Sequence, residues 1–221
     1  MIIVHHLNNS RSQRVLWLLE EMGLPYEVKR YERDAKTMLA PAELRAIHPL
    51  GKSPVIQDGD IIVAETGAIV EYLLETWPAA GLRPAAGTAD GRRFTYWLHY
   101  AEGSAMTPLL LKLVFGALPD RAPGLLKPIV KSISNKAGTS FINPQIAAHT
   151  AYWEAELGKT GWFAGDAFSA ADIMMSFPLE AGGSRAPYGP DKPRVKAFLT
   201  AIHARPAYQR ALERGGPYAY A

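Results

Sequence analysis

Strand-like and helical patterns alternate over the first eighty residues. Residues 2–6 begin with a β-branched apolar run, and residues 26–31 (YEVKRY) alternate in polarity, so each segment predicts a strand. A helical pattern lies between them and ends at Gly23; its apolar positions are Val15, Leu18, Leu19 and Met22. These three elements predict a strand–helix–strand unit.

An Asp-Gly pair separates the next two apolar runs. Residues 55–57 and 60–63 read as strands, and Asp58-Gly59 between them predicts a hairpin whose two turn positions have positive φ. A short helix is predicted before this hairpin at residues 41–47. The helix after it carries apolar positions at Ile69, Leu73 and Trp77. This order of elements is the thioredoxin-like α/β arrangement.

Beyond residue 88, nearly every stretch has helical spacing. A long helix begins near Thr88, and Pro108 is expected to kink or end it. Further helices are predicted at residues 125–137, 146–157, 170–179 and 192–204. The chain therefore predicts a thioredoxin-like domain over 1–80, a linker rich in Ala, Gly and Pro over 81–87, and an all-α helical domain over 88–221.

Composition narrows the classes of function. The 221 residues include no cysteine, which excludes disulfides, thiolate metal sites and a protein-borne thiol nucleophile. The absence of cysteine, of a signal peptide and of a long uninterrupted apolar run indicates a cytoplasmic protein without a membrane segment. The six histidines lack metal-ligand spacing, so no metal is expected.

The net charge of +3 is modest. The nearest approach to a basic row is Lys127, Lys131 and Lys136, which we interpret as a solvated helix face. A nucleic-acid-binding surface normally has a denser stripe of basic residues. We therefore expect no nucleic-acid partner.

Polar side chains crowd the start of the first helix. Asn9, Ser10 and Ser12 precede its apolar positions, and a helix start stabilises a bound thiolate, carboxylate or phosphate through its backbone N–H groups and dipole. Ser10 to Gln13 also fits the capping box S-x-x-Q, in which the serine hydroxyl serves the helix instead of a ligand. Both interpretations of Ser10 stay open at this point.

Four segments together resemble the glutathione S-transferase family, in its bacterial and fungal forms with SRSxR before the first helix. They are NSRSQRVLWLLEEMGLPYE, HPLGKSPVI, AETGAIVEYL and FSAADIMM, and they occur in the family's order and spacing over nearly the whole chain. The resemblance implies the glutathione transferase fold, with glutathione as co-substrate. It also implies a homodimer whose interface involves both domains.

The resemblance implies that a polar group at the first helix start binds the sulfur of glutathione and favours its thiolate. Ser10 and Asn9 are the candidates, and Arg11 adds positive charge. Asn9 stands where several related classes have a catalytic serine or cysteine. Family members with asparagine there often favour disulfide reduction, so a glutathione-dependent disulfide or peroxide reductase is an alternative.

The other glutathione contacts are assigned by the same resemblance. Lys52 would pair with the glycine carboxylate, and the backbone at Ser53, before a cis Pro54, would pair with the cysteinyl part. Glu65 and Thr66, at a second helix start, would hold the γ-glutamyl ammonium and carboxylate groups. The alternatives are that Lys52 is a solvated loop residue and that Thr66 is a plain N-cap.

The second substrate is expected between the domains, against a helix that carries Tyr100, Ser104 and Met106. The sequence thus predicts an enzyme that activates glutathione for attack on a small hydrophobic electrophile. A non-catalytic ligand-binding or interaction protein that keeps the fold is the alternative of another class. Ser169 and Asp172 match a second capping box, which we interpret as a folding element.

Overall fold

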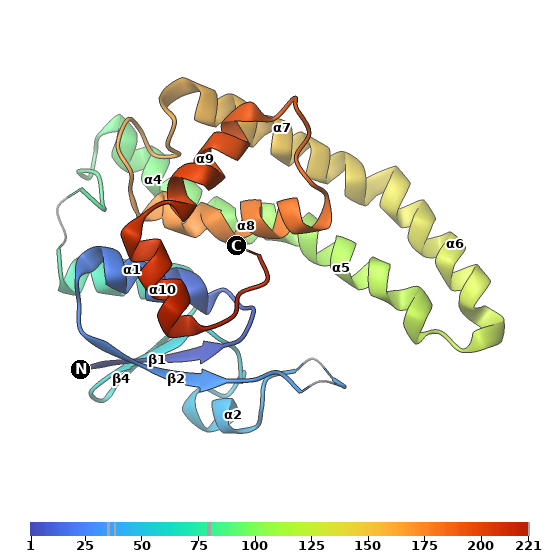
Figure 1. Ribbon diagram of the computed structural model, residues 1–221, viewed down its shortest axis with the longest axis horizontal. Helices are drawn as coiled ribbons and strands as arrows, with labels where there is room; N and C mark the ends of the chain where they lie inside the picture. Colours follow the sequence, from blue (N-terminus) through green and yellow to red (C-terminus); the bar gives the residue numbers. More distant parts are fainter. Residues whose placement is uncertain (35, 38, 79–80, 221) are drawn as a thin grey trace.

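The computed structural model describes residues 1–34, 36–37, 39–78 and 81–220. Its first part holds one four-stranded sheet in the order β2-β1-β3-β4 (Figure 1). The strands are β1 (Ile2–Leu7), β2 (Tyr26–Tyr31), β3 (Val55–Asp58) and β4 (Ile61–Ala64). Strand β1 pairs in parallel with β2 and antiparallel with β3, and β3 pairs antiparallel with β4.

Three helices accompany this sheet: α1 (Ser12–Met22), α2 (Glu43–Ile47) and α3 (Thr66–Thr76). The predicted thioredoxin-like order is confirmed, and Gly23 ends α1 in the left-handed conformation, with φ of 65°. The predicted hairpin turn was one residue out of place. Asp58 pairs with Ile61 as the last residue of β3, so the turn residues are Gly59, with φ of 59°, and Asp60.

After residue 88, the described residues form helices and loops. The elements are α4 (Ala89–Tyr100), the π-helical turn η1 (Ala101–Ala105), α5 (Met106–Arg121), the 3₁₀ turn η2 (Gly124–Leu126), α6 (Lys127–Ala137), the π-helical turn η3 (Gly138–Ile142), α7 (Asn143–Thr160), α8 (Ala170–Arg185), α9 (Pro193–His203) and α10 (Pro206–Gly215). Helix α10 was not predicted. The predicted boundaries at Ala80 and Ala221 lie outside the described residues.

Pro108 does not end the long helix. A proline has no N–H to donate and its ring crowds the carbonyl four residues earlier, here that of Ser104. The helix accommodates this conflict with the π-helical turn η1 immediately before α5. The consequence is a change in the helical phase between α4 and α5, which decides which side chains of this helix meet the cavity described below.

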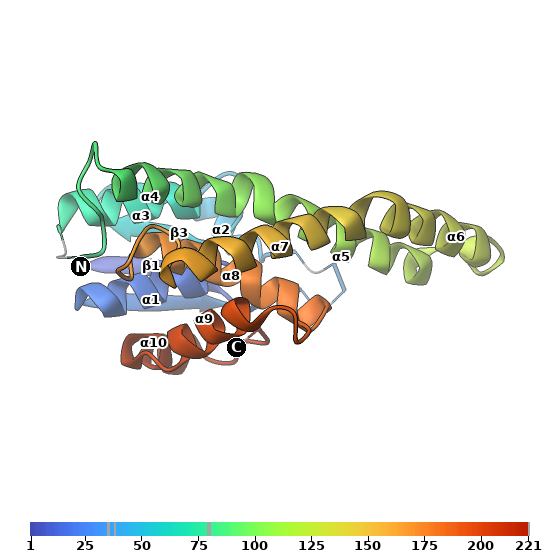
Figure 2. The same cartoon turned by 90° about the horizontal axis from the view of Figure 1, so that it is seen from above.

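Helix α1 lies in the middle of the molecule, between the sheet and the helical part (Figures 1 and 2). Every residue from Ser12 to Leu19 is buried. Trp17 packs edge-to-face on Tyr208 of α10, with ring centroids 5.1 Å apart. One hydrophobic cluster includes buried side chains of the sheet, of α1 and of the helical part, so both parts of the chain share a core.

The predicted capping box at the start of α8 is confirmed. The Ser169 hydroxyl accepts from the N–H of Ala171, and the Asp172 carboxylate accepts from the N–H of Ser169 at 2.8 Å. The same carboxylate accepts from the N–H of Phe163 at 2.8 Å, which ties the preceding loop to the helix. These bonds fix the start of the helix that forms one wall of the site.

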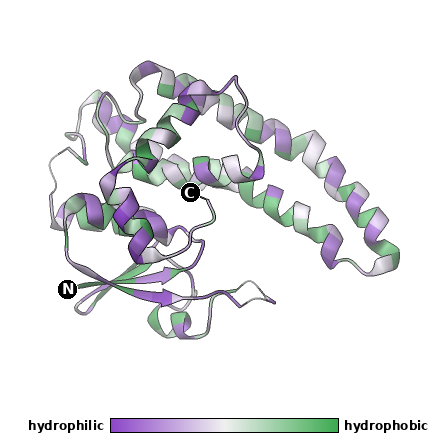
Figure 3. Ribbon diagram, in the orientation of Figure 1, coloured by the Kyte–Doolittle hydropathy of each residue, from purple (hydrophilic) through white to green (hydrophobic). Residues whose placement is uncertain are grey.

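Helices α5 and α6 form an arm that extends away from the rest of the molecule (Figures 1 and 2). Hydrophobic residues alternate with hydrophilic ones along this arm (Figure 3). Its exposed large apolar side chains are Leu110, Leu113, Val114, Leu118, Leu125, Leu126, Ile129 and Ile133. The accessible surface of 11200 Å² exceeds the about 10,000 Å² expected for a compact monomer of this mass. The arm is therefore a partly apolar surface without a partner among the described residues.

Within the described residues, one helical run is long and apolar enough to cross a membrane when judged by length and composition alone. This run is Ala89–Arg121, 33 residues that comprise α4, η1 and α5. Core helices of water-soluble proteins pass the same test. Trp97, Ala101 and Ala105 from its middle belong to the shared core, so this part of the run packs as a core helix.

Candidate functional site

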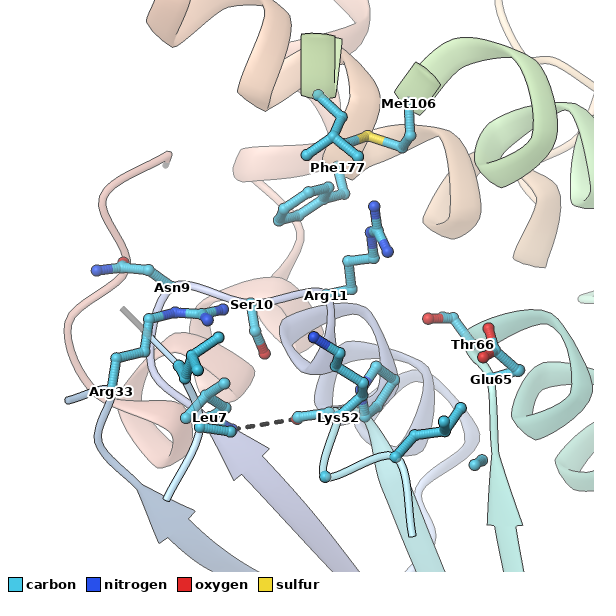
Figure 4. A pocket seen from close by; sticks show the side chains of 18 of the residues that line it. Leu7, Asn9, Ser10, Arg11, Arg33, Lys52, Glu65, Thr66, Met106 and Phe177 are labelled. Carbon is cyan, nitrogen blue, oxygen red and sulfur yellow. Dashed lines mark hydrogen bonds between the residues drawn. The ribbon is translucent and has the colours of Figure 1, made fainter. Parts of the chain in front are cut away.

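A cavity of about 430 Å³ lies where the two parts of the chain meet. Its floor comes from the loop between β1 and α1, the loop before β3 and the turn between β4 and α3, and its upper wall comes from α5, α8 and the segment after α10 (Figure 4). The lining includes nine residues singled out from the sequence: Asn9, Ser10, Arg11, Lys52, Ser53, Pro54, Glu65, Thr66 and Met106. Segments far apart in the chain thus converge on one space.

The start of α1 does not form the capping box that the sequence from Ser10 to Gln13 allowed. The N-cap position belongs to Arg11, which makes no side-chain capping bond. The Ser10 hydroxyl accepts from the N–H of Ser12 at 3.2 Å, and the Gln13 side chain is buried without a hydrogen-bond partner among the described residues. Because the reciprocal bond of a capping box is not formed, Ser10 is not committed to that role and borders the cavity.

Asn9 has a left-handed backbone, with φ of 47°, a conformation that asparagine tolerates better than most residues. Its side-chain oxygen accepts from the N–H of Ala219 at 2.8 Å, which fastens the segment after α10 to the loop that opens α1. In Figure 4 the Asn9 side chain points away from Lys52 and from the Glu65–Thr66 turn. Both candidates for the sulfur contact line the cavity, but only Asn9 is turned away from the other proposed contacts.

The loop before β3 is held against β1 by one side chain. The Ser53 hydroxyl donates to the carbonyl of His5 at 2.8 Å and accepts from the N–H of Leu7 at 3.2 Å, the latter bond being dashed in Figure 4. The peptide bond between Ser53 and Pro54 is cis. Lys52 is exposed and its amine points into the cavity (Figure 4). The Ser53 side chain thus holds the loop against β1, and the backbone of Ser53 is left to contact a ligand.

The start of α3 also faces the cavity. Glu65 occupies its N-cap position with φ of 71° and makes no side-chain capping bond. A positive φ is costly for a residue other than glycine, and such strain is concentrated at ligand-binding sites. Thr66 is the first helical residue, and its buried hydroxyl accepts from Arg14 at 3.3 Å. The alternative that Thr66 is a plain N-cap is therefore wrong.

Arg14 is a buried side chain that the sequence analysis missed. Its guanidinium donates to Thr66, to the backbone carbonyl of Met174 at 2.7 Å, and to the Glu102 carboxylate. Glu102, in η1, also pairs with Arg11 at 3.2 Å. Burial alone would raise the pKa of Glu102, but the charges of Arg14 and Arg11 hold that pKa below its ordinary value. This ionised cluster joins the floor of the cavity to its upper wall.

The upper wall is largely apolar. Met106, Leu110 and Phe177 line it, and Tyr220 packs edge-to-face on Phe177 with ring centroids 5.5 Å apart. Neither Phe177 nor Tyr220 was assigned to the site from the sequence. Phe177 lies on α8, which is buried on nearly all sides, and Tyr220 lies beyond the last helix. An apolar wall beside a polar floor is the arrangement expected of a site for a small molecule with one apolar part.

Of the three residues expected to meet the second substrate, only Met106 lines the cavity. Tyr100 is buried, and its hydroxyl contacts His149 and accepts from the Trp153 indole at 3.0 Å. Ser104 is exposed and does not line the cavity. The resemblance assigned the second-substrate groups to this helix but did not fix which side of it meets the cavity, and the π-helical turn η1 between Tyr100 and Met106 changes the helical phase. We therefore leave Tyr100 and Ser104 out of the site.

The described residues that line the cavity carry a net positive charge. Arg11, Arg33, Lys52 and Arg185 are basic, whereas Glu65 is acidic. Such a lining favours an anionic ligand. Among the residues that the structure describes, no group of three or more His, Asp or Glu side chains is arranged to hold a metal ion.

The two parts of the chain match two family models. Residues 1–75 match the model described as "Glutathione S-transferase, N-terminal domain", and residues 125–214 match "Glutathione S-transferase, C-terminal domain". Glutathione S-transferase 3 of Schizosaccharomyces pombe is 31% identical over 217 residues, covering 97% of this chain and 88% of the relative. The chain belongs to the glutathione S-transferase family.

Two further proteins are similar to this chain over nearly its whole length. Glutathione S-transferase 1 of Saccharomyces cerevisiae is 31% identical over 223 residues, covering 97% of this glutathione S-transferase chain and 95% of the relative. A crystal structure of a glutathione S-transferase from Actinobacillus pleuropneumoniae has 33% identity and a TM-score of 0.82, covering 100% of this chain and 95% of that one. The predicted family and fold class are confirmed.

The buried ion cluster predicts a pH-dependent effect of Glu102→Gln. At neutral pH the variant should lose about 3 kcal/mol of unfolding free energy, because Arg14 is left buried without its counter-charge. Folding lowers the pKa of Glu102, so its ionised form stabilises the folded state above the ordinary pKa of glutamate, and this contribution is lost as pH falls through the folded-state value.

The difference between wild type and Glu102→Gln should therefore shrink below about pH 4. Urea denaturation at a series of pH values measures it, with Glu213→Gln, an exposed site on α10, as the control. A difference that stays constant with pH would contradict the assignment of this charge to the cluster.

Proposed function

We propose that this family member binds glutathione in the cavity, favours its thiolate, and presents the sulfur to a small hydrophobic electrophile. The observation that carries the proposal is the convergence on one cavity of Ser10, Lys52 and the Glu65–Thr66 turn, which come from three separate segments. The names of the relatives support glutathione transferase activity in general. The chemistry of these residues complements a ligand with two carboxylates, one ammonium group and one thiol.

The proposed contacts follow from charge and position. Glu65 binds the γ-glutamyl ammonium group, and the start of α3, with Thr66, binds the adjacent carboxylate. Lys52 binds the glycine carboxylate, and the backbone at Ser53 and Pro54 pairs with the cysteinyl part. These residues hold the tripeptide across the floor of the cavity, which leaves its sulfur near the start of α1.

We assign the sulfur contact to Ser10, with Arg11 contributing positive charge. A free alkyl thiol has a pKa of about 8.5, and each unit by which that pKa is lowered corresponds to about 1.36 kcal/mol. One hydrogen bond to a charged group contributes roughly 1.5 to 3 kcal/mol, and a helix start about 0.3 to 1 kcal/mol. Together these effects are large enough to ionise most of the bound thiol near neutral pH. The thiol proton leaves to solvent.

The second substrate would lie against Met106, Phe177 and Tyr220, above the sulfur. Their apolar surfaces favour a small hydrophobic electrophile, and holding it beside the thiolate supplies proximity. The reductase alternative depends on Asn9 as the sulfur contact. The bond from Ala219 to the Asn9 oxygen holds this side chain in a direction away from the other proposed contacts, which favours the transferase.

The first experiment follows the ultraviolet absorbance of bound glutathione thiolate as a function of pH. In the wild-type protein the midpoint should lie about two units below the free value, and Ser10→Ala should raise it by at least one unit. Asn9→Ala should leave it nearly unchanged, because the Asn9 side chain points away from the other proposed glutathione contacts. A wild-type midpoint equal to that of free glutathione would instead favour disulfide chemistry, and no binding would favour a non-catalytic role.

Glu65→Gln should weaken glutathione binding at least tenfold, about 1.4 kcal/mol, because it removes the charge that faces the ammonium group while it keeps the side-chain shape. Titration calorimetry measures the dissociation constant. Glu71→Gln is the matched control, since Glu71 lies on the same helix outside the cavity lining. Equal affinities of Glu65→Gln and wild type would remove Glu65 from the site.

We also propose a homodimer that acts in the cytoplasm. Monomers rarely expose so many large apolar side chains together, and a two-fold symmetric interface would cover the arm of one copy with the other. Exposed Ile61 and Ile62 on β4 provide apolar surface in the first part of the chain as well. These two surfaces agree with an interface that involves both domains.

Sedimentation velocity at micromolar concentration tests the dimer. The wild-type protein should sediment as a dimer, whereas the double variant Ile129→Glu with Ile133→Glu should sediment as a folded monomer, because both side chains are exposed on α6. The control is Glu213→Gln on α10, which should remain dimeric. A wild-type protein that is only monomeric would overturn the proposal.

A further inference from the structure

A chain of buried polar groups runs from the cavity into the interior. The Ser10 and Ser12 hydroxyl oxygens are 2.7 Å apart, and the Ser12 oxygen lies 2.8 Å from Nδ1 of His6 on β1. The exposed fractions of the three residues are 4%, 0% and 3% for Ser10, Ser12 and His6. Only the Ser10 end of this chain borders the cavity, so the other two groups reach a ligand only through Ser10.

The two hydroxyl groups cannot turn independently. The N–H of Ser12 donates to the Ser10 oxygen at 3.2 Å, and the Ser12 hydroxyl also lies 3.5 Å from the carbonyl of Leu7. Buried polar groups need partners, and each hydroxyl has one proton to donate. The direction in which Ser12 donates therefore decides whether Ser10 donates inward or into the cavity.

His6 completes the chain as a neutral ring. Burial and, next, the charge of Arg30 on β2 lower its pKa to about 4, while the Gly215 backbone of α10 and the charge of Glu32 act in the opposite direction. At neutral pH the ring thus carries one proton. When that proton is on Nδ1, His6 donates to Ser12; when it is on the other nitrogen, Nδ1 accepts from Ser12. The backbone of Gly215 accepts from the ring, so it favours the second arrangement, and a bound thiolate has to outweigh this bond to select the first.

We propose that Ser12 and His6 are positioning residues that direct the hydroxyl proton of Ser10 toward the sulfur of the bound ligand. This inference rests on the proposed function. In the arrangement selected by a thiolate, Nδ1–H of His6 donates to Ser12, Ser12 donates to Ser10, and Ser10 donates to the sulfur. No bond to carbon or sulfur is made or broken in the chain, and the ring stays neutral.

The physical gain comes from cooperation between the bonds. Donors aligned in one direction polarise each other, which strengthens the terminal bond by roughly 10–30% for each added bond. The chain is also shielded from water, so it competes with no solvent hydrogen bonds. The added strength therefore falls on the bond that Ser10 makes to the sulfur.

The thiolate titration of bound glutathione tests this proposal. Ser12→Ala should raise the midpoint by roughly 0.2 to 1 unit, because it removes two aligned bonds that each add about 10–30% to the strength of the bond between Ser10 and the sulfur. If Ser12 acts through Ser10, the double variant Ser10→Ala with Ser12→Ala should have the same midpoint as Ser10→Ala alone. Additive shifts in the double variant, or a Ser12→Ala midpoint equal to wild type, would overturn the proposal.

Variants of His6 give a second test of the proposal, which does not require that the Ser12→Ala protein folds. An asparagine side chain in place of the ring keeps a polar group near the position of Nδ1, so His6→Asn should retain most of the wild-type shift, whereas His6→Leu should lose as much as Ser12→Ala. Equal midpoints for the two His6 variants would count against the chain. A wild-type protein that does not lower the thiol midpoint would instead contradict the proposed function itself.

Ser134→Ala is the matched control for removing a buried serine hydroxyl. Ser134 lies on α6, and its hydroxyl has no hydrogen-bond partner among the described residues. Its removal should leave the thiol midpoint unchanged. Thermal unfolding of every variant separates loss of stability from loss of sulfur activation, because a merely structural role would lower the melting temperature without moving the midpoint.

Discussion

The buried guanidinium of Arg14 is the interaction on which the arrangement of the site depends. It contacts α3 through Thr66, η1 through Glu102 and α8 through a backbone carbonyl, so one side chain of α1 joins four elements. A buried charge is tolerated only when it is paired and hydrogen-bonded. The relative positions of these elements are therefore coupled, and with them the floor and the upper wall of the cavity.

Much of the fold could be predicted because its signals are local. Gly23 ends a helix, Gly59 permits a tight turn, and Ser169 with Asp172 begins a helix, each through its own backbone or nearest neighbours. Helix α10 was missed because it is short and its buried positions include small alanines. The turn at Gly59 was misplaced by one residue because the Asp-Gly pair marks a turn without fixing the register of the two strands, and Asp58 pairs with Ile61 as the last residue of β3.

The floor of the site was easier to predict than its upper wall. The floor residues stand beside starts of helices and strands, where residue type indicates a role, and the resemblance to a known family supplied their order. Tyr100 and Met106 show why the upper wall was harder to predict: the resemblance pointed to their helix but not to the side of it that meets the cavity, and a π-helical turn lies between the two residues. Arg14 and Phe177 were missed because only tertiary packing makes them partners.

The position of α1 has a consequence for how this protein can vary. The helix is buried from Ser12 to Leu19, and its first residues stand beside the cavity, so almost every substitution along it alters the interior of the molecule. Such a helix has little neutral variation available, since a change that the site would accept must also be accepted by the core. In return, the groups at its start are held rigidly, with little conformational entropy left to lose when a ligand arrives.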